Sequence, residues 1–343
     1  MSGTGTVEAT PARGGPAMDR VFLGALLVLL AFVILVVVDQ SFWWRTNEDF
    51  SFGWLTPAFV AFVLYDRWAE LSRRVAACAD PAAPHTGPGM TRLVNTLATL
   101  ALLAGLALFV LGAAYRSGAG TTYPGSLALS IGLALCVFPL VILFTPSPPP
   151  ATAAPLHQDS RLKVASLFVF PALVWLLSAP NISKIDAWLT GILLQKVIGV
   201  VYFCFNTFGF PLERQGTVLI LPDASRVGVE DACSGIRSLK ACLFAGSFLG
   251  AVMLDRFWKK VTLVVAAMLF AFAMNLVRGL FLTGYAYRNG AASIEGRIHD
   301  TAGYAILGVT VIGLLCLVPL LGGSIFGGPA KPKAPADEEI FED

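Results

Sequence analysis

Charged residues are scarce in this sequence, and their scarcity excludes most soluble folds. Only 13% of the 343 residues are charged, against about 25% in soluble domains, while 56% are hydrophobic and the mean hydropathy is +0.73. This balance is typical of a membrane protein with several spans. The formal net charge is only +2, so no basic field exists and no nucleic-acid partner is predicted.

Closely spaced pairs of cysteines or histidines are also absent from the sequence. The six cysteines are scattered, mostly within apolar runs, and no C-x-x-C spacing occurs, which excludes a disulfide framework and a zinc pattern. The three histidines lie in different segments, and no H-E-x-x-H motif occurs. The sequence therefore predicts no metal and no other cofactor. The residues concerned are Cys78, Cys136, Cys204, Cys233, Cys242, Cys316, His85, His157 and His299.

Long apolar runs are what the chain has in abundance. A helix needs about 20 apolar residues to cross a bilayer, and eight runs qualify. The first run is too long for a signal-peptide core and has no small-residue cleavage site, so we interpret it as retained. We predict an all-α polytopic membrane protein with about eight transmembrane helices. The predicted spans are 21–38, 54–69, 93–114, 125–144, 162–179, 236–254, 261–283 and 302–321.

A ninth apolar run, 186–208, has a different character. Its polar residues suit a helix that lies in the interface, or a re-entrant helix packed against the protein, better than a lipid-facing span. If this run does not cross and the N-terminus is cytoplasmic, the turn Asp255–Lys260 falls inside, as the positive-inside rule prefers. If it crosses, that turn moves outside. The polar residues are Asp186, Thr190, Gln195, Lys196 and Asn206.

The remaining segments are tails and loops. Residues 1–18 and 322–343 are predicted to be disordered and 19–321 to form one membrane-embedded domain. Within the loop 209–231, Thr217–Leu221 and Arg226–Val229 read as short strands around the turn P-D-A-S. The sequence therefore predicts a small extracytoplasmic β-hairpin at about 217–229, just before a cysteine.

Three reactive side chains are predicted to meet at the outer face of the membrane. Cys233, in D-A-C-S-G-I-R-S-L-K, stands at the start of the sixth predicted helix. Arg278, in F-A-M-N-L-V-R-G-L, lies about 7–8 Å before the outer end of the seventh. His299, in R-I-H-D-T-A-G-Y, comes just before the eighth. This arrangement suits acyl transfer by a thiol.

The chemistry of such a site follows from the residue types. A helix N-terminus and a nearby cation both lower the pKa of a cysteine thiol. His299 could take the thiol proton and later protonate a leaving amine, while Arg278 could hold the charge on a carbonyl oxygen. A charged arginine within a span costs at least about 2.5 kcal/mol, which makes Arg278 a functional candidate.

Four further residues are candidates for supporting roles. Asn275 lies one turn before Arg278 on the same helix face and could orient it. Arg237 could be a second anion clamp or an ordinary interfacial anchor, and the sequence leaves both open. Ser234 and Asp300 adjoin the reactive residues. Each residue also has a simpler reading, because a lone cysteine in a membrane helix is usually packing and a lone arginine can snorkel to the interface.

The order of these motifs resembles the exosortase/archaeosortase family. The resemblance is carried by A-C-S-G-I-R-S-L, then N-L-V-R, then H-D-x-x-G, together with the G-x-x-x-x-L-P pattern of the hairpin. A weaker match is N-E-D-F-S-F-G-W-L-T-P (Asn47–Pro57), where Phe52 stands in place of the histidine often found in the family. The resemblance covers roughly residues 40–320.

The resemblance implies a membrane cysteine transpeptidase or protease with an extracytoplasmic active site in the plasma membrane. Cys233 would be the nucleophile, Arg278 the oxyanion stabiliser and His299 the acid/base. The implied partners are membrane lipid and exported proteins with a C-terminal sorting signal, which is a short motif, a membrane helix and a basic cluster. The product is released or transferred to a cell-surface acceptor. The substrate and the oligomeric state are not specified by the sequence.

Two other classes of function are consistent with the residues. A transporter or assembly scaffold would use Arg278 and the polar run 186–208 to line a pathway or a partner groove. The sequence contains no internal repeat, which counts against a transporter. A membrane acyltransferase would use the same thiol on a lipid.

Overall fold

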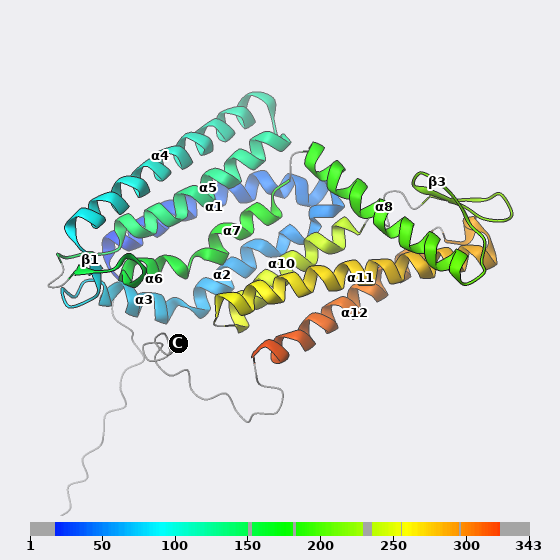
Figure 1. The fold of residues 1–343 in the computed structure, drawn as a ribbon. Coiled ribbons are helices and arrows are strands. Elements are labelled where there is room, and N and C mark those ends of the chain that lie inside the picture. Colours follow the sequence, from blue (N-terminus) through cyan, green and yellow to red (C-terminus); the bar gives the residue numbers. More distant parts are fainter. Residues whose placement is uncertain are drawn as a thin grey trace, which may run out of the picture. The chain divides into compact units, whose positions relative to one another are not determined.

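The chain folds into two compact units (Figure 1). The first contains residues 1–46 and 53–180, and the second contains 47–52 and 181–343. The computed structural model describes residues 18–149, 153–180, 183–228, 235–254, 256–294 and 296–322. Nearly all of the two predicted tails lies outside these ranges.

Helices dominate both units. The first unit holds α1 (Arg20–Thr46), α2 (Thr56–Asp66), α3 (Trp68–Ala77), α4 (Pro88–Ala119), α5 (Tyr123–Phe144), α6 (Ser160–Ser166) and α7 (Val169–Ser178). The second holds α8 (Ser183–Thr207), α10 (Ile236–Met253), α11 (Phe257–Asn289) and α12 (Arg297–Gly322). The short 3-10 helices are η1 (Glu48–Leu55), η2 (Leu156–Gln158) and η3 (Ala291–Ile294). The strands are β1 (His85–Thr86), β2 (Ala153–Ala154), β3 (Glu213–Gln215), β4 (Val218–Ile220) and β5 (Arg226–Gly228).

Eight helical stretches in the described part of the chain are long and apolar enough to cross a membrane. This confirms the predicted all-α polytopic membrane protein with about eight spans. Seven of the stretches correspond to predicted runs, and two of those runs, 162–179 and 236–254, extend one residue past the helix. The eighth is Ala187–Thr207 in α8, which by length and composition can cross a membrane, whereas the predicted run 54–69 is not among them.

The run 54–69 is interrupted by charge. Helix α2 ends at Asp66, and Arg67 separates it from α3. Its 11 residues rise only about 16 Å, roughly half of the hydrocarbon thickness. Helix α3 then carries Glu70 and Arg74, which form an ion pair of 2.6 Å. The predicted span 54–69 is therefore wrong in length, because the helix that forms there ends at Asp66.

Glycines bring α4 and α5 together in the first unit. A Cβ atom on Gly132 would lie 2.7 Å from the backbone nitrogen of Phe109, and one on Gly105 would lie 2.9 Å from the Cys136 sulfur. Small residues at a helix interface let the backbones approach closely, which is how helices associate where no hydrophobic driving force is available. The α4–α5 pair lies side by side in Figure 1.

A buried polar layer joins α1, α5 and α7. The Gln40 side chain is fully buried and donates to Ser130 Oγ at 2.8 Å and to the Trp175 carbonyl at 3.0 Å. Its own carbonyl oxygen accepts from the Ser178 hydroxyl at 2.7 Å. Buried amides need such partners, so these bonds fix the rotation of three helices relative to one another.

A buried ion pair closes one end of the first unit. Asp159 caps α6 and accepts bidentate hydrogen bonds from Arg161, at 3.2 Å to Nε and 2.9 Å to Nη2. Arg161 is 2% exposed, and its Nη1 donates to Asn95 Oδ1 at 2.9 Å. Burial opposes ionisation of Asp159, but the bonds from Arg161 outweigh it and lower the pKa of this carboxyl.

In the second unit, two helices pack on different halves of α11. In α10, a Cβ atom on Gly246 would lie 3.1 Å from that of Ala267. Val197 of α8 lies 3.2 Å from the Cβ position of Gly279, in the C-terminal half of α11. The 33 residues of α11 rise about 50 Å, far more than a bilayer core of about 30 Å. A helix of this length can reach past a bilayer core, and α8 packs on its C-terminal half.

A three-stranded sheet completes the second unit. The antiparallel order is β3-β4-β5, with Leu219 opposite Val227. The strands β4 and β5 confirm the predicted hairpin. Strand β3 was not predicted, because its three residues E-R-Q are exposed and carry no alternating pattern. Leu219 and Val227 pack in one core with Val197 and Leu282, so the sheet covers the same end of α11 as α8.

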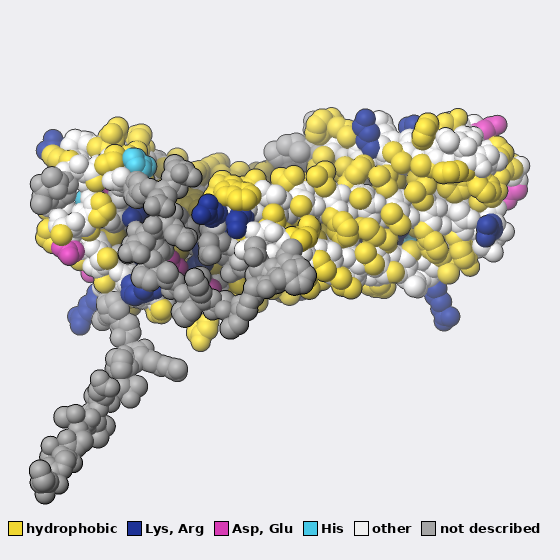
Figure 2. Space-filling model, turned by 60° about the horizontal axis from the view of Figure 1, so that its bottom comes forward, with side chains coloured by type: hydrophobic (Ala, Val, Ile, Leu, Met, Phe, Trp, Pro, Cys, Tyr) yellow, Lys and Arg dark blue, Asp and Glu magenta, His cyan; other side chains and the backbone are white. Residues whose placement is uncertain are grey.

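Hydrophobic side chains cover much of the visible surface of the second unit (Figure 2). Val265 and Leu269 of α11 are 50% and 65% exposed, and Val311 and Leu315 of α12 are also exposed. Such faces suit contact with lipid. The chain is an integral, multi-pass membrane protein.

The Asp159–Arg161 pair makes stability depend on pH. Asp159→Asn should lower the free energy of unfolding in detergent at pH 7 by about 3–5 kcal/mol, because Arg161 would remain buried without a counter-charge. Since folding lowers the Asp159 pKa, this stabilisation is complete above the unfolded value of about 3.9 and is lost as pH falls through the folded value. Unfolding at pH 7 and below pH 4 should show the difference between parent and variant shrinking.

The matched control is Asp80→Asn, at an exposed carboxylate in the same unit, which should change the free energy of unfolding by less than about 0.5 kcal/mol. A difference for Asp159→Asn that stays constant across pH would contradict the assigned role.

Candidate active site

Helix α10 begins at a glycine that touches α11. Gly235 precedes the helix with φ +73°, in the left-handed region that glycine adopts most easily. A Cβ atom here would lie 2.5 Å from Asn275 Nδ2. The Asn275 side chain is nearly buried, so the backbone at position 235 fits against a fixed amide. Only glycine provides both the conformation and the space.

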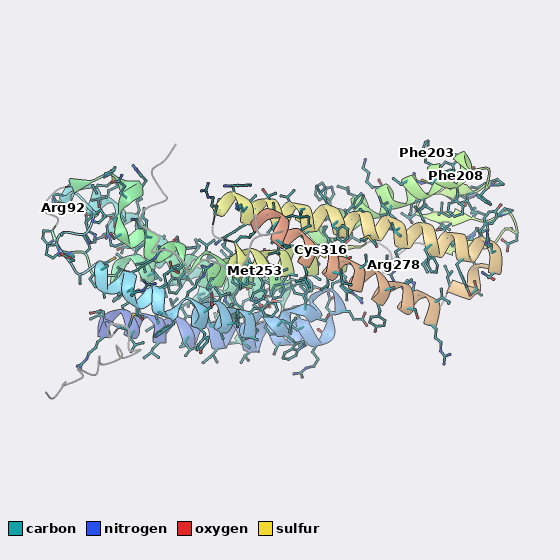
Figure 3. All side chains as sticks on the ribbon, turned by 90° about the horizontal axis from the view of Figure 1, so that it is seen from below. Arg92, Phe203, Phe208, Met253, Arg278 and Cys316 are labelled. Carbon is teal, nitrogen blue, oxygen red and sulfur yellow. The ribbon has the colours of Figure 1, made fainter. Side chains whose placement is uncertain are left out.

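Arg278 and His299 form a direct hydrogen bond between α11 and α12. Arg278 Nη2 lies 2.8 Å from His299 Nε2 and 3.4 Å from the His299 carbonyl oxygen. A guanidinium can only donate, so Nε2 accepts. With Nε2 as the acceptor, the ring proton of His299 is on Nδ1. Figure 3 labels Arg278 on α11.

A second glycine makes room for the guanidinium. Gly303 lies one turn after His299 on α12, and its Cβ position is 3.3 Å from Arg278 Nη2. A larger side chain here would push against the arginine. The spacing H-D-x-x-G therefore has a geometric meaning, because the histidine supplies the acceptor and the glycine supplies the space above it.

The helix that carries Arg278 is longer than the sequence predicts. The 18 residues of α10 rise about 27 Å, close to the thickness of the hydrocarbon core, and α10 begins beside Asn275. Arg278 lies one turn further along α11, which runs on to Asn289. The predicted depth of 7–8 Å assumed that the helix stops near its last apolar run. Arg278 instead lies well before the end of α11 at Asn289, one turn after the Asn275 that the start of α10 contacts.

The predicted site residues are described to different extents. The structure brings Arg278 and His299 together and places Asn275 against Gly235. Cys233, Ser234 and the Asp300 side chain lie outside the described residues.

Arg237 has two carboxylate partners. Its Nη2 lies 2.5 Å from Glu48 Oε2, and its Nε lies 3.5 Å from Asp49 Oδ1. The two roles considered for it, a second anion clamp and an interfacial anchor, do not describe this pairing.

The five described cysteines lie elsewhere. Cys242 is packed in the core between α10 and α11. Cys316 is exposed on α12, and the rise from position 299 to 316 is about 25 Å. Burial first, and then the charge of Asp159, raises the pKa of Cys78 to about 11, so this thiol is unreactive at neutral pH. Cys136 and Cys204 lie in α5 and α8. Among the described residues, no group of three or more histidine, cysteine or acidic side chains could hold a metal ion.

Sequence reasoning missed several residues around this site. Gly235 and Gly303 stand within the recognised motifs, and the sequence assigns them no role, although a glycine often marks a place where another group approaches the backbone closely. Glu48 and Asp49 could not have been assigned to Arg237, because nearly 190 positions separate them in the chain.

The sequence matches a known protein family. Residues 43–316 match the family described as transmembrane exosortase. The chain belongs to the transmembrane exosortase family. Neither a curated protein nor a solved structure matches it. Membership supports a membrane enzyme related to protein sorting, and the matched range includes Gly235, Asn275, Arg278, His299 and Gly303.

The contact between Gly235 and Asn275 predicts a specific stability pattern. Gly235→Ala should be destabilising through two causes, the left-handed backbone, about 1–2 kcal/mol, and the overlap with Asn275, a further 1–3 kcal/mol or so. Unfolding in mixed detergent measures both. Adding Asn275→Ala should remove most of the second cost, because the overlapping amide is gone.

Gly209→Ala is the matched control. Gly209 has φ +82° and no atom within 4 Å of its Cβ position, so only the backbone cost should appear. Equal losses for Gly209→Ala and Gly235→Ala would contradict the close contact with Asn275.

Proposed function

We propose that the protein is a cysteine transpeptidase or protease that cleaves a C-terminal sorting signal of exported proteins. The observation that carries this proposal is the hydrogen-bonded pair Arg278–His299, one helix turn from the Asn275 that Gly235 contacts. Gly235 follows Cys233 by two positions in the sequence. Family membership supports the same chemistry.

The proposed reaction forms and resolves a thioester. The Cys233 thiolate attacks the scissile carbonyl, and Arg278 stabilises the negative charge on the carbonyl oxygen. His299 receives the thiol proton and then gives it to the leaving amine as the C–N bond breaks. Water or an acceptor amine next attacks the thioester, its proton passes to His299, and the thiolate leaves.

The Arg278–His299 bond also suggests how the base becomes available. In the present arrangement the lone pair of His299 Nε2 is occupied by the guanidinium. When a substrate carbonyl takes over that donor, Nε2 is released and can accept a proton. Substrate binding would then free the base at the moment when it is needed.

The charge distribution supports an extracytoplasmic site in the plasma membrane. Arg256, Lys259 and Lys260 lie at the α10–α11 turn, which is the end opposite to Gly235 and Asn275. Basic residues prefer the cytoplasmic side of membrane proteins. With that turn inside, Arg278 and His299 face outward.

Loss of the nucleophile is the first test. Cys233→Ala should reduce processing of an exported protein with a short motif, a C-terminal hydrophobic helix and a basic tail by at least 100-fold or so. The uncleaved form should accumulate in cells and be visible as a larger band. Cys316→Ser is the control, because this exposed thiol lies at the other end of α12 and should leave processing unchanged. Normal processing by a well-expressed Cys233→Ala variant would exclude the proposal.

The side of the membrane is a separate test. A membrane-impermeant maleimide applied to intact cells should label Cys233, as located by mass spectrometry of the modified peptide. Prior incubation with a permeant maleimide should block the label. If Cys233 reacts only after the cells are permeabilised, the site faces the cytoplasm and the proposed substrate class falls.

A further inference from the structure

A short segment far from α10 in sequence packs along its first turns. Residues 47–52 follow α1 in the chain but belong to the second unit. Arg237, in the first turn of α10, is paired with Glu48 at 2.5 Å and Asp49 at 3.5 Å. These contacts connect the chain near position 48 to the residues that immediately follow Gly235.

Two further contacts extend this packing along α10. The Lys240 ammonium lies 4.1 Å from the centroid of the Phe50 ring, and the rings of Phe52 and Phe244 are 5.1 Å apart. Phe50 is fully buried and Lys240 is 8% exposed, so the ammonium sits on the ring away from water. A cation over an aromatic face is attracted most strongly when it is desolvated.

The three α10 residues share one face of the helix. Positions 237, 240 and 244 are spaced by three and four, which places their side chains in one row. Each meets a different member of the segment, which contributes carboxylates first, then a buried ring and then a second ring. The row of contacts follows the first two turns of α10 and continues directly from Gly235.

The charges at this end of α10 can be explained by the helix dipole. A helix N-terminus carries partial positive charge, so a cation in the first turn is unfavourable and carboxylates are favourable. Arg237 alone would oppose the helix dipole. Glu48 and Asp49 neutralise it and bring negative charge to the helix start, so the ion pairs suit this position better than a free arginine would.

We propose that Arg237 is a positioning residue, which with Lys240 holds segment 47–52 as a clamp on the first turns of α10. The clamp fixes Gly235 against Asn275. It thereby sets the position of the backbone at the start of α10, which Cys233 precedes in the sequence. This role rests on the proposed function, because Cys233 matters only if it reacts. The side chain of Arg237 is occupied by carboxylates and does not serve as an anion-binding group for substrate.

A charge swap tests the clamp. Arg237→Glu should slow both substrate processing and maleimide labelling of Cys233 at pH 7 by about tenfold, and processing should fall in kcat rather than in KM. The rise of the labelling rate with pH should move to higher pH. A thiolate that is displaced from a neighbouring cation is less stable, so the pKa of the thiol increases. The double variant Arg237→Glu/Glu48→Arg restores opposite charges and should recover at least half of each loss.

Two controls keep the result interpretable. Arg214→Glu makes the same charge change on exposed β3 and should alter neither rate. The isosteric pair Glu48→Gln/Asp49→Asn removes both acidic partners with little risk to folding, and it should slow labelling even if Arg237→Glu does not express. The exposed ion pairs are sensitive to salt, so 1 M NaCl should reproduce part of the loss in the parent protein.

The outcomes separate the clamp from the proposed reaction. Failure of the double variant to recover, or parental labelling by Glu48→Gln/Asp49→Asn, would overturn the clamp while leaving the parent's activity intact. If Cys233→Ala still processes substrate, the reaction is wrong, but the labelling rates still decide whether Arg237 positions the start of α10.

Discussion

A guanidinium within a long apolar helix must find its hydrogen-bond acceptors within the protein, and the second unit is arranged around this constraint. Inserting Arg278 costs at least about 2.5 kcal/mol if nothing compensates it. His299 accepts at 2.8 Å, and Gly303 leaves the space that the guanidinium fills. Because both partners belong to α12, the bond fixes the register of α12 on α11. The rest of that interface follows, with Leu314 packed beside Ala267 and Ala271.

The unequal lengths of two neighbouring helices place this bond at a boundary. Helix α10 has 18 residues and α11 has 33, and they are joined by a short turn, so α11 continues well past the start of α10. The additional turns of α11 are covered by α8 and by the sheet, through a core that includes Val197, Leu219 and Leu282. The start of α10 therefore lies where the cover of α11 changes from α10 to α8 and the sheet. Asn275, which Gly235 contacts, and Gly279, which Val197 contacts, lie on either side of this change.

The site was predictable where its signals are local, and unpredictable where they are not. Arg278 and His299 could be named from sequence because each stands in a short local motif, N-L-V-R and H-D-x-x-G. The hairpin was predictable from its alternating residues around P-D-A-S. The length of the second predicted span was not predictable, because the average hydropathy over a window of apolar residues does not reveal that the helix ends before Arg67. The pairing of Arg237 with Glu48 was equally hidden, since an ion pair between residues so distant in sequence leaves no periodic trace in either segment.

The two arginines of the site have different described partners, carboxylates for Arg237 and an imidazole for Arg278. Arg237 is 56% exposed and is matched by two carboxylates, so its charge is already neutralised and its binding capacity for a further anion is low. Arg278 Nη2 lies 2.8 Å from His299 Nε2, so the two cationic and basic groups of the proposed reaction already touch. A developing oxyanion gains most from a donor that is preorganised. In the proposed reaction the oxyanion therefore falls to Arg278, whereas Arg237 can influence the reaction only through the position of the backbone that it holds.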